Sequence, residues 1–531
     1  MYRPPAIGMK AMVSSGNALA SIAGLRVMID GGNAVDATIA INTVLHVTSP
    51  FVCGMGGDLF ALVYDARTGN VHGFNGSGRT PAAMSIPYMR GLGHQTMPRA
   101  GGLPVTVPGC ADGLAQLHER FGTLPWADLF KPAIDYARDG HPVGPDSARY
   151  FATGLRTNSH SVSWMRTFAP DGTTPIPGQV IRQPELAASL ERVAAEGRDG
   201  FYLGELARRL VAQVRTDGGV MTEEDLADHR GEWSTPPATT YRGNTVYTTA
   251  PNSQGITALI ALNLLEEIDL ANSEWGSPGA IAYLAEATKL ACADRDRYIS
   301  DPAFTDIPTD WLLSKDRLRG ALERGRQAPP VNLSSAGDTT SFCVVDPQGN
   351  AVSCIQSNYM DFGSGVVVGG FGLQNRGAYF SLDPGHVNRL DPRKRTLQTM
   401  MVTMVMAADK PWIVFGSVGG DIQPQTHLQV LTNVIDYKMN IQDAIESPRF
   451  VLGLGNEPGS LKPFRLESRF DAGVFEGLRT LGYEPEPAPS LPGRPGWSTG
   501  FGLGQGIVID PAGGARFGGA DPRWDAYAAG F

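Results

Sequence analysis

One stretch of this 531-residue chain holds the residues best suited to covalent chemistry. It runs from Gly337 to Gly365 and reads GDTTSFCVVDPQGNAVSCIQSNYMDFGSG. A polar run precedes it, and the alternating residues from Thr339 predict two strands joined by a turn at 347–350. If the chain were cut before Thr339, the new α-amine, with a reference pKa of about 8, could take the proton of the hydroxyl on the same residue. Thr339 would then supply both nucleophile and base.

A second candidate is a glycine pair between a strand and a helix. Residues 410–417 predict a buried strand that runs into Gly419 and Gly420, and residues 425–437 predict a helix. Backbone N–H groups at such a junction can stabilise a developing oxyanion, and the helix dipole adds to the effect. The alternative is a tight turn without a catalytic role.

A third candidate is Arg79, in the glycine-rich loop 75–81. An arginine in such a loop can bind an oxyanion or a carboxylate. It is equally typical of an ordinary surface loop, and the sequence leaves both interpretations open.

Composition excludes several classes of function. The net charge of −9 argues against a nucleic-acid partner, which requires a basic face. No apolar run approaches the roughly 18 residues of a membrane helix, and the N-terminus lacks a secretory leader, so we expect no membrane partner and a cytoplasmic location. The five cysteines and nine histidines show no metal-ligand spacing, so we expect neither a metal nor another cofactor.

The elements that must position these residues are both helices and strands, and the second half of the chain is richer in strands. The 65 glycines and 39 prolines are spread without a period, which indicates many turns and favours a β-rich mixed fold. Apolar spacing predicts two helices at 15–30 and 34–46, followed by a hairpin at 58–76. Further helices are expected at 111–121, 125–139, 185–196, 204–217, 255–268 and 279–298, and a final hairpin at 500–519.

Several motifs, in this order, resemble the γ-glutamyltransferase family of the N-terminal-nucleophile hydrolase superfamily. They are Gly31-Gly-Asn-Ala-Val-Asp36, Gly54-Met-Gly-Gly-Asp58, the stretch from Asp338 to Gly365, Gln374-Asn-Arg-Gly-Ala378, Gly416 to Asp421 with Gln423-Pro-Gln-Thr-His427, and Gly519-Ala-Asp-Pro-Arg523. The resemblance covers nearly the whole chain.

This resemblance implies an α+β fold, a four-layer αββα sandwich, made as a precursor that cuts itself between Asp338 and Thr339. The products would be a large chain of residues 1–338 and a small chain of residues 339–531. They would stay interleaved as a heterodimer, with a dimer of heterodimers left open. Thr339 would be the nucleophile, Ser357 would position it, and Gly419 with Gly420 would form the oxyanion hole.

The substrate-binding positions depart from the family pattern. Tyr359 stands where the family has an asparagine, and Arg376 and Tyr379 match its glutamine and aspartate positions. Gln398 and Thr399 replace a pair of serines, and Ser77 replaces an arginine for which Arg79 is a candidate substitute. Asn375 completes the expected substrate-binding set. The loss of the family's aspartate, together with the gain of an arginine at its glutamine position, disfavours an α-ammonium and suits an acyl group that carries a carboxylate or carbonyl.

The sequence therefore predicts a self-processing N-terminal-threonine hydrolase that acts on a small molecule. We expect it to cleave a γ-glutamyl-like amide through an acyl-enzyme, with hydrolysis favoured over transfer. Three alternatives within the family remain open: a glutaryl or cephalosporin acylase, an oxamate-type amidohydrolase, and a carbon–carbon bond hydrolase. An unprocessed homologue without activity is the rival outside the enzyme class.

Overall fold

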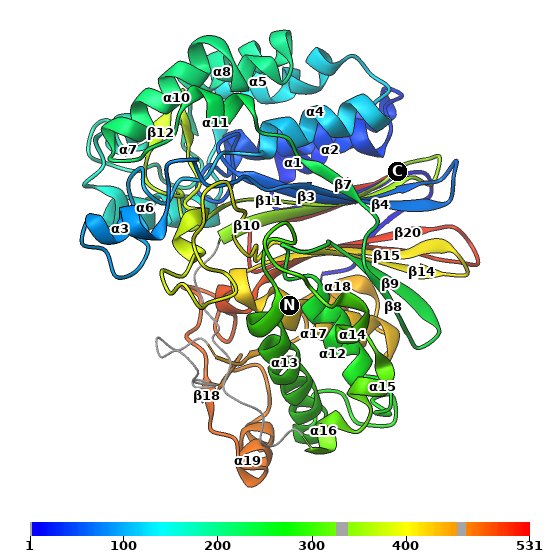
Figure 1. Cartoon of the computed structure of the whole chain (residues 1–531). Coiled ribbons are helices and arrows are strands. Elements are labelled where there is room, and N and C mark those ends of the chain that lie inside the picture. The colour runs from blue at the N-terminus through cyan, green and yellow to red at the C-terminus, as the bar shows by residue number, and fades with distance from the viewer. Residues whose placement is uncertain (1–2, 325–337, 454–463) are drawn as a thin grey trace.

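The protein is built from two β-sheets that pack face to face, with helices on both outer faces (Figure 1). The computed structural model describes residues 3–324, 338–453 and 464–531. The predicted four-layer αββα sandwich is confirmed. Residues 327–337, in the polar run that precedes Thr339, lie outside the described residues.

The first sheet carries the predicted nucleophile in one of its central strands. Its strand order is β21-β2-β10-β11-β3-β4-β7, and every pair of neighbours is antiparallel. The strands are β2 (Met12–Ser15), β3 (Asp58–Asp65), β4 (Asn70–Gly76), β7 (Glu232–Ser234), β10 (Asp338–Val345), β11 (Ala351–Tyr359) and β21 (Tyr527–Gly530).

The second sheet carries the glycine pair at the end of a central strand. Its order is β1-β20-β19-β15-β14-β9-β8, again antiparallel throughout. The strands are β1 (Ala6–Gly8), β8 (Ala238–Tyr241), β9 (Asn244–Thr248), β14 (Val402–Ala407), β15 (Lys410–Val418), β19 (Leu503–Ile509) and β20 (Arg516–Ala520). Short pairings join β5 (His141–Pro142) to β6 (Val180–Ile181), β12 (Val367–Val368) to β13 (Phe371–Gly372), and β17 (Phe464–Leu466) to both β16 (Phe450–Val451) and β18 (Pro485–Pro487).

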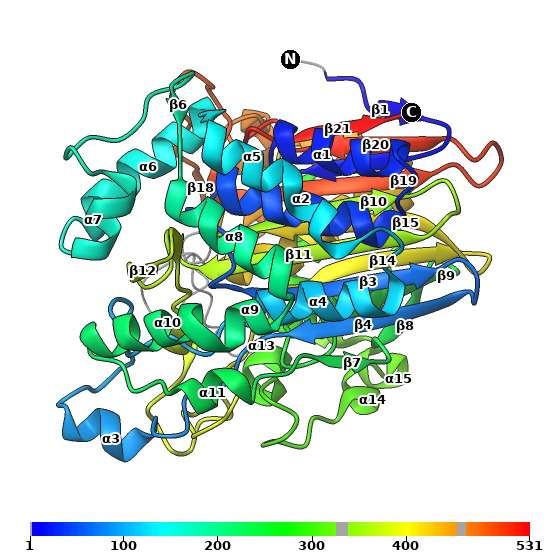
Figure 2. The same cartoon turned by 90° about the horizontal axis from the view of Figure 1, so that it is seen from above.

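The outer face of the first sheet is covered by helices of the N-terminal half (Figure 2). Helix α2 is buried at every position, because it lies between the sheet and other helices. Its first N–H groups are capped by the Asn33 side chain, and Asp36 completes a capping box. The helices of this half are α1 (Ala18–Ile29), α2 (Ala34–Thr48), α3 (Ile86–Gly91), α4 (Cys110–Phe121), η1 (Trp126–Phe130), α5 (Lys131–Asp139), α6 (Pro145–Asn158), α7 (Val162–Phe168), α8 (Pro184–Glu196), α9 (Asp199–Tyr202), α10 (Gly204–Thr216) and α11 (Glu223–Ala227).

The outer face of the second sheet is covered by a separate group of helices (Figure 1). Helix α12 is also buried throughout and packs against α13 and α17. The elements of this half are α12 (Ile256–Leu265), α13 (Pro278–Tyr298), α14 (Thr309–Leu312), α15 (Lys315–Leu318), α16 (Ala321–Arg324), η3 (Arg376–Tyr379), η4 (Gly420–Ile422), α17 (Gln423–Ile435), α18 (Ile441–Glu446), α19 (Ala472–Thr480) and η5 (Thr499–Phe501). No described helix is long and apolar enough to cross a membrane.

An apolar layer between the sheets holds the sandwich together. Phe60, Ile355, Val414 and Ile507 are each no more than 1% exposed and belong to one cluster that joins strands of both sheets. Because β10 and β11 face β15 across this layer, the start of β10 and the end of β15 lie at the same end of the sandwich. The layer therefore brings Thr339 and the glycine pair to one place.

Several regions differ from the sequence-based expectation, and two lie in the first half of the chain. The single helix predicted at 125–139 is divided into η1 and α5, because Pro132 at the start of α5 lacks the N–H that a continuous helix would need. Helices α6 and α7 lie in a stretch for which the sequence yielded no prediction.

Candidate active site

Thr339 lies in an irregularity at the start of β10. Asp338 pairs with Tyr359 and Thr340 with Gln356, so the register shifts around Thr339. The Thr339 hydroxyl donates a hydrogen bond to Ser357 Oγ at 3.1 Å, and the Thr339 side chain is only 1% exposed. This bulge turns the hydroxyl toward the end of the neighbouring strand.

Ser357 lies at the end of β11 and is fully buried. Its Oγ accepts the backbone N–H of Tyr359 at 2.8 Å in addition to the bond from Thr339. Tyr359 has φ = 78°, a left-handed conformation that is costly for a large side chain. Ser357 therefore holds the Thr339 hydroxyl and this strained turn together.

The glycine pair forms a sharp turn between β15 and α17. Gly419 has φ = 121° and Gly420 has φ = 62°, values that glycine adopts at little cost. The turn is fixed by Gln254, whose Nε2 donates to the carbonyls of Thr399 (2.6 Å) and Gly420 (2.9 Å). Helix α17 begins directly after it, so the positive end of a 13-residue helix dipole lies beside the turn.

A buried ion pair between Arg295 and Asp421 supports this turn. Arg295 Nη1 donates to Gln254 Oε1 at 3.0 Å and to Asp421 Oδ1 at 2.9 Å. The half-buried Tyr379 donates its hydroxyl to the same Asp421 oxygen at 2.5 Å. Burial, and then the Asp421 charge, raise the pKa of Tyr379, so that it remains a donor at neutral pH. Asp421 is thus already engaged by two partners.

Arg376 is fully buried and contacts both Thr399 and Tyr359. Its Nη1 donates to Thr399 Oγ1 at 3.0 Å, and its guanidinium lies over the Tyr359 ring, 4.4 Å from the centroid. Its Nε and Nη2 are buried and have no partner among the described residues. Burial lowers its pKa, while the nearby Asp58 opposes that shift, and an arginine so placed stays charged at neutral pH.

Asp58 is a buried acidic residue close to Arg376. It lies at the start of β3, where it pairs directly across the sheet with Ser357. Its Oδ1 accepts the N–H of Gly78 at 3.1 Å and its Oδ2 accepts Gln398 Nε2 at 2.9 Å. Burial raises the pKa of Asp58 to about 6, although Arg376 lowers it.

Two candidate residues are engaged in other contacts. Arg79 forms ion pairs with Glu232 at 2.8 Å and with Asp301 at 3.4 Å, so its guanidinium is occupied by two carboxylates. Asn375 donates to the carbonyl of Arg99 and accepts the N–H of Met360, contacts that brace the loop after β11. Six of the other candidates form one network, which runs from Thr339 through Ser357, Tyr359, Arg376 and Thr399 to Gly420, with Gln254 as the link between the last two.

Comparison with known proteins shows the family. The chain matches the family described as gamma-glutamyltranspeptidase over residues 20–531. The chain belongs to this family. A glutathione hydrolase-like YwrD proenzyme from Bacillus subtilis (strain 168) is 40% identical over 531 residues, which is 99% of each chain. An oxamate amidohydrolase proenzyme from Klebsiella pneumoniae is 34% identical over 97% of each chain.

The structural comparison agrees with the family assignment. The crystal structure of cephalosporin acylase from Bacillus halodurans superimposes with a TM-score of 0.91 and 36% identity, over 100% of this chain and 97% of that chain. The protein is therefore a γ-glutamyltranspeptidase-family hydrolase of the N-terminal-nucleophile type, and its named relatives include both glutathione hydrolases and acylases.

Several residues that lie at the candidate site have no role predicted from the sequence. Asp58 and Asp421 stand inside glycine-rich motifs that supported the resemblance, whereas Gln254 and Arg295 belong to none of them. A charged residue next to consecutive glycines in a buried motif is a usable signal, because such a charge requires partners. Gln254 and Arg295 carried no comparable signal.

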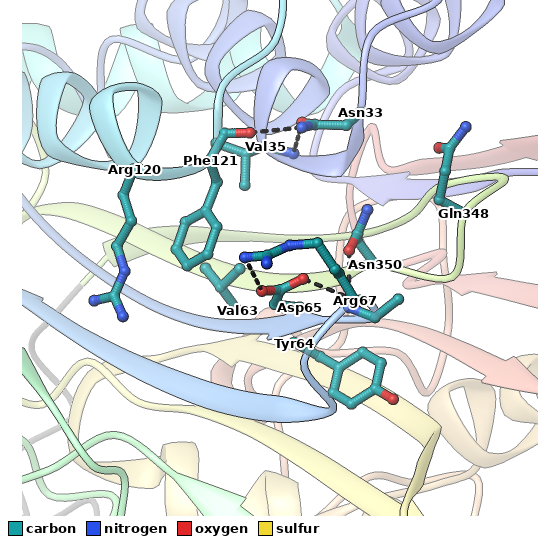
Figure 3. A pocket seen from close by; sticks show the side chains of 11 residues that line it. Asn33, Val35, Val63, Tyr64, Asp65, Arg67, Arg120, Phe121, Gln348 and Asn350 are labelled. Carbon is teal, nitrogen blue, oxygen red and sulfur yellow. Dashed lines mark hydrogen bonds and ion pairs between the residues drawn. The ribbon is translucent and has the colours of Figure 1, made fainter.

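A surface pocket of this family member lies at the opposite end of β10 and β11 (Figure 3). It has a volume of about 440 Å³ and is lined by Asn33, Asp65, Arg67 and Asn350, among others. Its polar groups are largely occupied: Asn33 caps α2 and bonds the carbonyl of Phe121, and Asp65 bonds Arg67. This pocket contains none of the predicted site residues.

Proposed function

We propose that this protein is a self-processing amidohydrolase whose nucleophile is Thr339. The hydrogen bond from the Thr339 hydroxyl to Ser357, at the end of the sandwich that also holds the Gly419–Gly420 turn, is the observation that carries this proposal. In the uncut chain the nitrogen of Thr339 is part of a peptide bond and cannot act as a base. Activity therefore requires cleavage between Asp338 and Thr339.

Cleavage would use the same hydroxyl. The Thr339 oxygen attacks the carbonyl carbon of Asp338, the peptide C–N bond breaks, and the nitrogen takes up a proton to become the α-amine. Water then hydrolyses the ester that joins Asp338 to the Thr339 oxygen. The relatives named proenzymes support this route, and so does the near-complete burial of Thr339 in the uncut chain.

The mature site would hydrolyse an amide in two steps. The α-amine of Thr339 accepts the hydroxyl proton while the oxygen attacks the substrate carbonyl. The N–H groups of Gly419 and Gly420 would bind the resulting oxyanion, and the protonated amine gives its proton to the leaving nitrogen. Water, deprotonated by the same amine, then releases the acyl group and regenerates Thr339.

The acyl pocket would be formed around Arg376. Two unpartnered donors on one edge of a guanidinium match the two oxygens of a carboxylate. Asp421, the acidic group nearest to Tyr379, is already occupied by Arg295. We therefore favour a γ-glutamyl-like acyl group that presents a carboxylate or carbonyl to Arg376.

The test is substitution of the nucleophile. Wild-type protein should separate on a denaturing gel into two fragments, residues 1–338 and 339–531, and should release p-nitroaniline from glutaryl- or γ-glutamyl-p-nitroanilide. Thr339→Ala should remain a single 531-residue band and be inactive, since it lacks the attacking oxygen. Thr340→Ala, at the adjacent buried threonine, is the matched control and should be processed normally. A wild-type chain that stays intact, or activity in Thr339→Ala, would exclude the proposal.

A further inference from the structure

The side-chain amide of Gln398 has only one orientation compatible with an ionised Asp58. A carboxylate can only accept hydrogen bonds, so the NH₂ group of Gln398 must face Asp58, as the 2.9 Å contact shows. The main chain of Gln398 is fixed as well, because its N–H donates to the carbonyl of Asn252 and its carbonyl accepts the N–H of Gln254, both at 2.8 Å. Neither the backbone nor the side chain of Gln398 is free to turn.

This orientation leaves a buried acceptor without a donor. Gln398 is 0% exposed, and its Oε1 has no partner among the described residues. The next residue, Thr399, holds Arg376 by its Nη1, and the Nε and Nη2 of that arginine are also unpartnered. Gln398 bonds Asp58, and the charge of Arg376 acts on that carboxylate, so the acceptor of Gln398 and the two donors of Arg376 belong to one buried region.

Unsatisfied polar groups of this kind require a partner from outside the chain, either water or a ligand. Each one costs about 1–3 kcal/mol in a folded protein, so such groups are seldom left without a partner. A carboxylate would satisfy the two donors of Arg376. The acceptor of Gln398 requires something different, namely an N–H or O–H group on the ligand.

We propose, on the basis of the proposed function, that Asp58 is a positioning residue that fixes the orientation of the Gln398 amide. As a result, the pocket selects acyl groups that carry a hydrogen-bond donor beside a carboxylate. The donor is expected to be neutral, such as a hydroxyl or an amide N–H. An ammonium group would have to lose its water beside the buried Arg376 charge, and like charges that close repel each other.

The Asp58–Gln398 pair can be exchanged to test this idea. In Asp58→Asn the new side-chain NH₂ can donate to Gln398 Oε1, so the Gln398 amide should turn and present its NH₂ to the pocket instead. Adding Gln398→Glu should restore an acceptor to the pocket, because one carboxylate oxygen accepts from the new amide and the other faces the ligand. The double variant also keeps the total charge of the pair.

The experiment compares three p-nitroanilides in fully processed enzyme: glutaryl, 2-hydroxyglutaryl with the hydroxyl beside the free carboxylate, and γ-glutamyl. Wild type should prefer the hydroxyl-bearing substrate to the glutaryl one by about tenfold in kcat/KM, as expected for one hydrogen bond to a buried acceptor. The γ-glutamyl substrate should be the poorest of the three. Asp58→Asn should abolish the tenfold preference, mainly through KM, and Asp58→Asn/Gln398→Glu should restore it.

If Asp58 had a purely structural role, Asp58→Asn would lower kcat/KM for all three substrates alike, and the second substitution would not restore the preference. Equal preference in wild type and Asp58→Asn, or a double variant that does not recover it, would overturn the inference. If Asp58→Asn fails to fold, Gln398→Met, which has no acceptor, should abolish the preference in its place.

Calorimetry with the free acids provides a second measurement on wild type. 2-Hydroxyglutarate should bind about tenfold more tightly than glutarate, and equal binding or no binding of either acid would also overturn the inference. Failure of the proposed function would be distinct, because the two fragments would then be missing from the denaturing gel.

Discussion

Asp58 is a carboxylate whose ionisation is opposed by its burial. Burial raises its pKa from 3.8 to about 6, while Arg376 and the N–H of Gly78 act in the opposite direction. A raised pKa means that the folded protein holds the proton more tightly than the unfolded chain does. The resulting stabilisation is fully present below pH 3.8 and is lost as the pH rises through about 6, a change of about 3 kcal/mol.

Replacing the single residue Asp58 should therefore change how the stability of the protein depends on pH. Asp58→Asn should raise the Tm relative to wild type, and the difference should be larger at pH 7.5 than at pH 4.5, because only wild type carries the buried charge at the higher pH. Thermal unfolding followed by fluorescence at both pH values would measure it. Asp171→Asn, at an exposed aspartate, should show no such difference between the two pH values. An equal effect of Asp58→Asn at both pH values would contradict the assigned pKa.

At the scale of elements, the site depends on one strand–turn–helix unit. In the proposed mechanism the turn between β15 and α17 exposes two N–H groups, and only glycine adopts the φ of 121° at Gly419 without strain. A Cβ at Gly419 would lie 2.8 Å from Ile422 Cδ1 and 3.1 Å from the Cα of Gly502. The packing of the helix start and of the β19 region therefore leaves no room for a side chain here.

Gly419→Ala should therefore lower kcat by about 100-fold or more, as the loss of an oxyanion donor does, with a smaller change in KM. It should also slow the appearance of the two fragments, because cleavage passes through an oxyanion too. Gly514→Ala is the matched control: its φ of 72° is also positive, but a Cβ there would meet no atom within 4 Å. If Gly419→Ala kept wild-type kcat, this turn would not be the oxyanion hole.

At the scale of the whole molecule, the two predicted chains share both sheets. In the first sheet, β10 and β11 of the segment 339–531 lie between β2 and β3 of the segment before the cut. In the second sheet, β20, β19, β15 and β14 lie between β1 and β9 in the same way. Separation of the chains would break strand pairing in both sheets and expose the apolar layer between them.

We therefore expect the two fragments of processed enzyme to elute together in gel filtration, at the volume of uncut Thr339→Ala. They should separate only at denaturant concentrations that also abolish the circular dichroism of the sheets. Elution of the fragments as separate folded species would show that the division into 1–338 and 339–531 does not describe one interleaved fold.

The local features of this protein could be predicted from its amino-acid sequence. The hairpin that begins at Thr339, the glycine pair after β15 and most of the longer helices follow from spacing and turn chemistry, because these depend on residues close together in the chain. The family motifs extended that reading to the αββα sandwich. The cleavage site, the cytoplasmic location and the roles of the site residues stay predictions.

Which polar groups meet became visible only in the folded protein. Asp58 and Gln398 are 340 residues apart, and Arg376 could be read as a substrate-binding residue but not as one with two free donors. Arg79, open to two interpretations in the sequence, is paired with Glu232 and Asp301 instead. The physical reason is that burial and hydrogen-bond saturation depend on neighbours distant in the chain, which no local pattern records.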